Sequence, residues 1–237
     1  MRYPRRYNVV LAIGFGMTLA LASIVGSWAG AGAAYALEAV LFFAALTIGV
    51  VVVAGGQHPY PRFGPANIVT TIRAMLAALA AGLVGHPASP AVLWSVVGLI
   101  ALVAILDGVD GHLARATRMA SAFGARFDME TDAAFIFVLA ILVWQYGKAG
   151  AWVLLCGLMR YAFVAAGRLL PWLAAPLRAT RRGRIVAVGQ SIGLGVALAP
   201  IVPPPASAMV AVVTLAALTW SFAVDVMWLK GVRPPVE

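Results

Sequence analysis

The chain has 237 residues, of which 63% are hydrophobic and only 11% are charged, and its mean hydropathy is +0.96. This composition excludes an ordinary soluble domain and predicts an all-α, polytopic membrane helix bundle. In so apolar a chain, the net charge of +9 indicates cytoplasmic loops and contact with anionic lipid rather than binding to nucleic acid. The single cysteine, Cys156, permits no internal disulfide.

The first two apolar runs predict an N-terminal transmembrane hairpin. The first run, residues 9–28, follows a short basic tail and is long enough to span a bilayer. Tail and run also resemble a signal peptide, but the run exceeds the about 7–15 residues of a signal's apolar region, so we expect an uncleaved helix. The second run covers 34–54, and a linker rich in proline and glycine follows at 55–66. We therefore expect an accessory hairpin over 1–56 and a six-helix core over 57–237.

The third run, residues 67–85, opens with polar side chains at a regular spacing. Asn67, Thr70 and Arg73 are three residues apart, so a helix places them on one face. They are either part of a polar site or interfacial residues of a first helical turn.

The remaining apolar runs bring the expected number of transmembrane helices to about eight: 91–106, 133–146, 151–170, 184–200 and 206–229. If the N-terminus is inside and the helices alternate, the outside turns hold only Lys148 among the lysines and arginines. The positive-inside rule therefore predicts an integral protein, of the cell inner membrane, with both termini on the cytoplasmic side.

The stretch between the fourth and fifth runs, residues 107–132, reads DGVDGHLARATRMASAFGARFDMETD. It holds five of the chain's eight acidic residues: Asp107, Asp110, Asp128, Glu130 and Asp132. A carboxylate at the edge of a membrane costs free energy unless it is paired or metal-bound. The first two aspartates are three residues apart and the last two are four apart, so each pair shares a helix face. Two adjacent helices would bring all four aspartates to one point, with Glu130 off that face.

Four converging carboxylates repel one another, and divalent cations relieve the repulsion. Oxygen ligands alone select Mg²⁺, Mn²⁺ or Ca²⁺ rather than zinc, and two such ions about 4 Å apart form a clamp for displacement at phosphorus. Small side chains at Gly111 and Ala114 would let a bulky group approach. These residues predict transfer of a lipid diphosphate, and a lipid phosphatase fits nearly as well. The alternative is a pair of helix ends capped by acids at the membrane surface.

The spacing D-x2-D-G-x2-A-R-x8-G-x3-D-x3-D resembles the signature of the CDP-alcohol phosphotransferases. All eight positions match: Asp107, Asp110, Gly111, Ala114, Arg115, Gly124, Asp128 and Asp132. The N-x-x-T-x-x-R spacing from Asn67 resembles the opening of the first core helix of that family, although the usual preceding proline is displaced to Pro65. The resemblance extends over residues 67–229, which leaves the first two helices outside it.

The resemblance implies transfer of a phosphatidyl-type group from a CDP-linked lipid to a small alcohol, with release of CMP, in phospholipid synthesis. It implies two divalent cations, Mg²⁺ or Mn²⁺, on Asp107, Asp110 and Asp128. Asp132 would complete the metal site and act as general base on the acceptor hydroxyl. The cytidine diphosphate would be received by Gly111, Ala114, Arg115, Gly124, Asn67 and Thr70. The family also leads us to expect a homodimer among membrane lipids.

An acceptor site is a further hypothesis. Arg160 falls near the middle of the sixth span, and with Arg168 and Arg184 it could bind the phosphate of an acceptor such as glycerol 3-phosphate or inositol phosphate. The alternative is a packing arginine that snorkels or is paired within the bundle. Two other functions compete with the transferase: a metal-dependent lipid-phosphate hydrolase that needs no alcohol, and a non-catalytic membrane scaffold or transporter.

Overall fold

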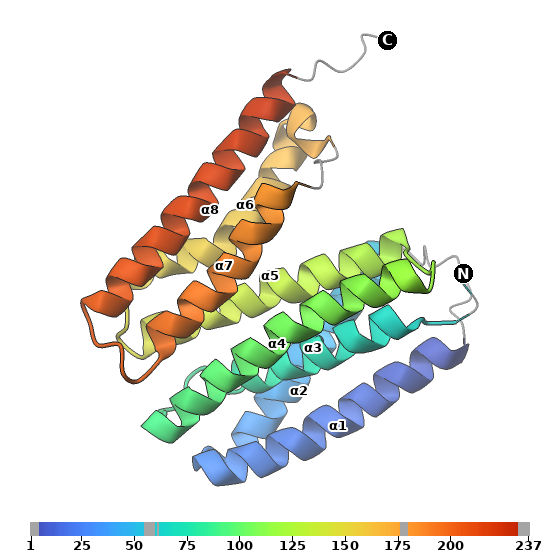
Figure 1. The fold of residues 1–237 in the computed structure, drawn as a ribbon. Coiled ribbons are helices and arrows are strands. Elements are labelled where there is room, and N and C mark those ends of the chain that lie inside the picture. Colours follow the sequence, from blue (N-terminus) through green and yellow to red (C-terminus); the bar gives the residue numbers. More distant parts are fainter. Residues whose placement is uncertain (1–4, 55–59, 61, 176–179, 232–237) are drawn as a thin grey trace. The chain divides into compact units, whose positions relative to one another are not determined.

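The computed structural model describes residues 5–54, 60, 62–175 and 180–231. It divides into two compact units, Met1–Val138 and Leu139–Glu237, which are described separately below. Within the described residues there are eight α-helices and two short 3₁₀ helices (Figure 1). The prediction of an all-α bundle with about eight helices is therefore confirmed.

The first unit begins with the expected hairpin, α1 (Arg5–Ala29) and α2 (Gly32–Ala54). The chain reverses at Gly30 and Gly32, whose φ angles of 72° and 65° lie in the left-handed region that glycine adopts most readily. The predicted boundary between this hairpin and the core falls in the linker, where residues 55–59 and 61 lie outside the described part of the chain. The division into hairpin and core therefore stays a prediction.

Helix α3 (Pro65–Ala81) packs against the hairpin on one side and against α4 on the other. Pro65 stands at its first turn, where a missing N–H costs nothing. The hydroxyl of Tyr35 on α2 donates to the carbonyl of Leu79, which fixes α2 along α3. The helix ends at Ala81, short of the predicted residue 85, because the chain turns there and Gly85 takes a φ of 85°.

Helix α4 (Pro90–Ala116) follows the turn after α3 and runs without a break into the first half of the acidic stretch. Ser89 caps its start by accepting a hydrogen bond from the backbone N–H of Val92 at 3.3 Å. Its 27 residues span about 40 Å at 1.5 Å per residue, which is more than a bilayer's hydrocarbon core needs. The apolar part of α4 therefore lies in the membrane while its last three turns carry Asp107 and Asp110 at the end of the span.

A tight connector joins α4 to α5 (Ala122–Gln145). Tyr60 fastens it, because the phenol hydroxyl lies 3.1 Å from the carbonyl oxygen of Arg118 and 3.2 Å from that of Ala120. Arg118 is held in a left-handed conformation with a φ of 52°, which is uncommon for a residue other than glycine. The connector sets where α5 starts, and so where Asp128 and Asp132 lie.

An aromatic layer packs the ends of these helices together. Phe63 and Phe123 are in edge contact, with ring centroids 6.3 Å apart, and Phe127 adjoins Phe123 at 6.1 Å. All three side chains are buried, and they share one apolar cluster with Phe43 of α2 and Met75 of α3. The hairpin, α3 and the start of α5 therefore share one core, which supports the polar residues beside it.

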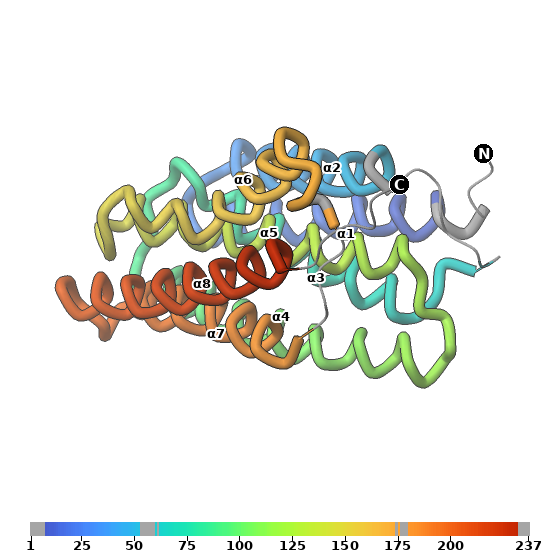
Figure 2. Tube along the Cα trace, turned by 90° about the horizontal axis from the view of Figure 1, so that it is seen from above, coloured from blue at the N-terminus to red at the C-terminus, as the bar shows by residue number. Residues whose placement is uncertain are grey.

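The second unit contains the end of α5, a 3₁₀ turn (Ala151–Leu154), α6 (Leu155–Leu169), a second 3₁₀ turn (Pro171–Ala174), α7 (Arg181–Leu198) and α8 (Ala206–Gly231). Helices α7 and α8 run side by side, orange and red in both Figure 1 and Figure 2. Small residues let them approach closely, since a Cβ at Gly193 would fall 2.0 Å from the Cγ2 of Thr214.

Five of the described helices are long and apolar enough to cross a membrane: α1, α2, α4, α8 and the stretch Ala151–Leu169 around α6. Helix α3 is apolar but shorter. The protein is therefore an integral membrane protein built as a polytopic helix bundle.

Candidate active site

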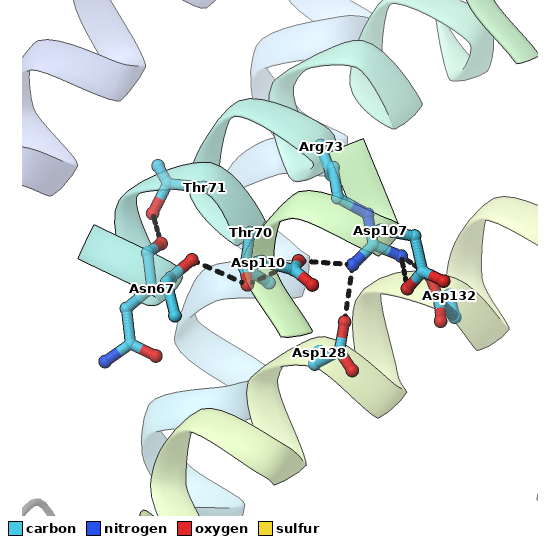
Figure 3. Close-up of polar contacts among 9 residues, drawn as sticks. Asn67, Thr70, Thr71, Arg73, Asp107, Asp110, Asp128 and Asp132 are labelled. Carbon is cyan, nitrogen blue, oxygen red and sulfur yellow. Dashed lines mark hydrogen bonds and ion pairs between the residues drawn. The ribbon is translucent and has the colours of Figure 1, made fainter. Parts of the chain in front are cut away.

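Arg73 lies at the centre of the four predicted aspartates (Figure 3). Its Nη1 is 2.6 Å from Asp110 and 2.5 Å from Asp128. Its Nη2 is 2.9 Å from Asp107 and also contacts Asp132. A single guanidinium on α3 thus joins the two aspartates of α4 to the two aspartates of α5. These five residues are called the Arg73 cluster below.

The spacing of the aspartates explains why they meet. Asp107 and Asp110 occupy adjacent turns on one face of α4, and Asp128 and Asp132 do the same on α5. Their convergence is the geometry that the sequence predicts.

The cluster is closed on one side and partly open on the other. The Asp110 side chain is 6% exposed, whereas the side chains of Asp107, Asp132 and Asp128 are 29%, 36% and 39% exposed. The Thr70 hydroxyl lies on the closed side, 3.2 Å from Asp110 and 3.1 Å from the carbonyl of Ala66. Because it has only one proton, it donates to one of these acceptors at a time. A substrate or ion can therefore reach Asp107, Asp128 and Asp132 more easily than Asp110.

Three of the aspartates fit a divalent cation. Asp107, Asp110 and Asp128 each offer one carboxylate oxygen, and these three atoms lie within 4.8 Å of one another. A set of carboxylate oxygens at the end of a membrane span suits Mg²⁺, Mn²⁺ or Ca²⁺. Asp132 is outside this group of three and is joined to it through Arg73. The donor set therefore fits the metal that the sequence predicts.

Asn67 and Gly124 belong to the packing around the cluster. The side-chain amide of Asn67 donates to the carbonyl of Phe63 at 2.5 Å. Its oxygen faces Gly124, where an added Cβ would lie only 2.8 Å away. Glycine at this position is thus explained by the close approach of α5 to α3. A role of either residue in binding cytidine diphosphate stays a prediction.

The other predicted nucleotide residues lie on the last turns of α4. Gly111 directly follows Asp110 and is half-buried, as is Ala114, while Arg115 is exposed. A Cβ at Gly111 would meet the guanidinium of Arg115 at 3.4 Å, so the Arg115 side chain lies over this glycine. A role of these three residues in binding cytidine diphosphate stays a prediction.

The central role of Arg73 is what sequence reasoning missed. Its three-residue spacing from Asn67 and Thr70 puts it on the correct face of α3, but spacing alone does not show which side chain reaches four acids at once. The informative signal was an arginine within an otherwise apolar helix, since such a charge requires partners.

Four of the remaining charged residues form ion pairs outside the Arg73 cluster. Glu130 pairs with Arg126 at 3.1 Å along α5, which agrees with its predicted place away from the aspartate face. Asp225 of α8 pairs with Arg182 of α7 inside the second unit. Arg160, Arg168 and Arg184 also belong to the second unit: the first is half-buried on α6, and the other two are exposed. Their proposed role in binding the acceptor stays a prediction.

Comparison with known proteins identifies the family. A family model described as CDP-alcohol phosphatidyltransferase matches residues 63–225, which include the whole Arg73 cluster. The chain is also 28% identical over 134 residues to a Cereibacter sphaeroides protein named CDP-diacylglycerol–glycerol-3-phosphate 3-phosphatidyltransferase. That match covers 55% of this chain and 61% of the relative, so the chain spans about three fifths of the relative's length. No solved structure matches the chain. Because the family match extends over well more than half of its residues, the chain belongs to the CDP-alcohol phosphatidyltransferase family.

Proposed function

We propose that this protein transfers a phosphatidyl group from a CDP-linked lipid, such as CDP-diacylglycerol, to a small alcohol and releases CMP. The observation that carries the proposal is the convergence of Asp107, Asp110, Asp128 and Asp132 at the end of a membrane span. A membrane-edge site lined by carboxylates suits a substrate that is both lipid and diphosphate, since its chains stay in the bilayer while its phosphates reach the acids through bound cations.

Asp107, Asp110 and Asp128 would hold the divalent cation or cations, Mg²⁺ or Mn²⁺. When bound there, the metal would neutralise charge on the diphosphate and on the departing CMP. The carboxylates themselves repel a diphosphate, so the site would bind the diphosphate only when divalent cations occupy it.

Asp132 is our candidate for the general base. The acceptor oxygen forms a bond to the phosphorus that carries the lipid, and the bond from that phosphorus to the bridging oxygen of CMP breaks. CMP leaves with the bridging oxygen, and the proton of the acceptor hydroxyl passes to a carboxylate oxygen of Asp132. At 36% exposure this side chain is among the more accessible acids of the cluster, as a base that meets an incoming alcohol must be.

The name of the relative favours one acceptor. The Cereibacter sphaeroides protein is named for glycerol 3-phosphate, and this phosphorylated alcohol is also the kind of acceptor that Arg160, Arg168 and Arg184 would suit. We therefore propose glycerol 3-phosphate as the acceptor, with transfer on the cytoplasmic side of the cell inner membrane.

The test is CMP release by the purified protein in detergent with CDP-diacylglycerol and Mg²⁺. The acceptors to compare are glycerol 3-phosphate, serine, inositol, inositol phosphate and choline, beside a reaction without acceptor. We expect CMP with glycerol 3-phosphate and little with the others. CMP in the absence of any acceptor would instead indicate a hydrolase, and CMP with a different acceptor would overturn the choice of glycerol 3-phosphate.

A further inference from the structure

We propose that Arg73 is a built-in counter-cation, which holds the four aspartates together without metal and competes with divalent cations for their oxygens, thereby setting the metal affinity of the site. The inference rests on the proposed function, because it takes these aspartates as the metal ligands.

The contacts of Arg73 fall on the same three aspartates that could hold a metal. The three residues whose oxygens lie within 4.8 Å of one another are Asp107, Asp110 and Asp128. Each of them is within 3 Å of a guanidinium nitrogen of Arg73, at 2.9, 2.6 and 2.5 Å. A cation on these carboxylates must therefore displace Arg73 or share the carboxylates with it.

Charge makes the two occupants competitors. A carboxylate has room for more than one partner, but a guanidinium and a divalent ion on the same carboxylates are only a few ångströms apart and repel each other. The repulsion is strong here because Arg73 is only 1% exposed and little water screens it. Arg73 also keeps its proton under all ordinary conditions, so it cannot yield by becoming neutral.

The same contacts explain what Arg73 contributes when metal is absent. One guanidinium balances one of the four carboxylate charges and bonds to all four acids, which would otherwise repel one another between α4 and α5. The shape of arginine matters for this, because its planar fork places two nitrogens between two pairs of acids. A lysine ammonium is a compact charge on a flexible stem and cannot reproduce that bridge.

Two opposite effects of removing Arg73 follow. The metal-free protein loses stability because its acids are no longer held, while the metal binds more tightly because its competitor is gone. A purely structural arginine would behave differently, since its loss would disorganise the aspartates and weaken both properties together.

The experiment compares wild type, Arg73→Gln and Arg73→Lys, purified in detergent without substrate. Mn²⁺ is titrated into each protein, free Mn²⁺ is followed by its electron paramagnetic resonance signal, and Tm is recorded with and without Mn²⁺. We expect the Mn²⁺ Kd of Arg73→Gln to be lower than that of wild type by about tenfold or more. Its metal-free Tm should fall, and Mn²⁺ should raise its Tm by more than it raises that of wild type.

Arg126→Gln is the matched control, because it removes an arginine of α5, two residues before Asp128 in the sequence, whose ion pair is with Glu130. Its Mn²⁺ Kd should stay within about twofold of the wild-type value. The Mn²⁺ Kd of Arg73→Lys should lie between the values of wild type and Arg73→Gln. The lysine variant keeps the comparison possible if the glutamine variant fails to fold.

An Mn²⁺ Kd that is unchanged or higher in both Arg73 variants would overturn the inference while leaving the metal site intact. If neither wild type nor any variant binds Mn²⁺, the metal site of the proposed function fails as well. Binding by the Arg73 variants but not by wild type would be the strongest form of the expected result.

Discussion

Glu130 and Asp132 lie two residues apart on α5, yet their side chains serve different purposes. Glu130 pairs with Arg126 along the helix, while Asp132 contacts the buried guanidinium of Arg73. A helix turns by about 100° per residue, so neighbours two apart face different sides. This contrast allows one acid to be tested against another in the same turn.

Asp132→Asn should lower CMP release by about 10²–10⁴-fold, because an amide cannot accept the acceptor's proton. Glu130→Gln should keep the wild-type rate within about twofold, since Glu130 pairs with Arg126 along α5 and not with the Arg73 cluster. The initial rates of the two variants, measured with CDP-diacylglycerol and glycerol 3-phosphate, give the comparison. An Asp132→Asn enzyme with more than about a tenth of wild-type activity would exclude Asp132 as the base.

Gly124→Ala should destabilise the protein even without substrate. The new methyl group would lie 2.8 Å from the side-chain oxygen of Asn67, which is held in place by its hydrogen bond to Phe63. Overpacking of this kind costs about 1–3 kcal/mol.

Gly98→Ala on α4 is the control for this change, because a methyl group there would meet no described atom within 4 Å. Thermal unfolding in detergent should give a lower Tm for Gly124→Ala and an equal or slightly higher Tm for Gly98→Ala. Equal Tm values for wild type and Gly124→Ala would show that α5 does not pack so closely on Asn67.

At the residue scale, the sequence predicts the aspartates well and Arg73 poorly. Fixed helical spacing determines which acids share a face, so Asp107 with Asp110, and Asp128 with Asp132, could be paired without a structure. The bonds of Arg73 depend on how far a long side chain reaches across three helices, and that distance is set by tertiary packing.

At the scale of single helices, α3 is the shortest α-helix of the first unit and carries much of the site. It has 17 residues, of which eleven are buried. The hairpin packs against α3, and so does α4, so the first two helices help to bury α3. The sequence predicts the existence of these helices from apolar length, but it gives no indication of this packing.

In the second unit, the close contact between α7 and α8 can be tested by a glycine substitution. Gly193→Ala should lower Tm by several degrees, because its methyl group would overlap the side chain of Thr214, and overpacking costs about 1–3 kcal/mol. Gly189→Ala, one turn earlier on α7, adds a methyl group that would meet no described atom within 4 Å. Circular dichroism melts of the two variants give the comparison, and a Gly193→Ala protein as stable as Gly189→Ala would contradict the contact.

At the scale of the whole molecule, the distribution of basic residues predicts how the chain is oriented in the membrane. Lys148, the lysine expected on the outside, is buried, and its ammonium donates to the carbonyls of Ala199 and Val202 at 3.0 and 2.7 Å. It therefore links the turn after α5 to the residues that follow α7. The positive-inside rule predicts the acidic motif to be cytoplasmic.

Cysteine labelling tests this orientation in a Cys156→Ala background, which removes the buried native thiol. Ala88→Cys lies in the turn before α4 and Ala120→Cys in the connector after it. A membrane-impermeant maleimide added to intact cells should label position 88 and should label position 120 only after the cells are opened. The reverse pattern would place the site on the outer side.

The most direct test of the account is the dependence of CMP release on metal bound by the Arg73 cluster. Wild-type protein is treated with EDTA, freed of chelator, and assayed with CDP-diacylglycerol and glycerol 3-phosphate before and after Mg²⁺ or Mn²⁺ is added back. Asp128→Asn, which removes a ligand from the three-acid group, is assayed beside it. We predict that CMP release disappears with EDTA, returns with the metal in wild type, and in the variant returns weakly or only at much higher metal concentration. CMP release that persists in metal-free wild type, or that responds to metal equally in Asp128→Asn, would contradict the claim that these aspartates form the metal site of the transfer.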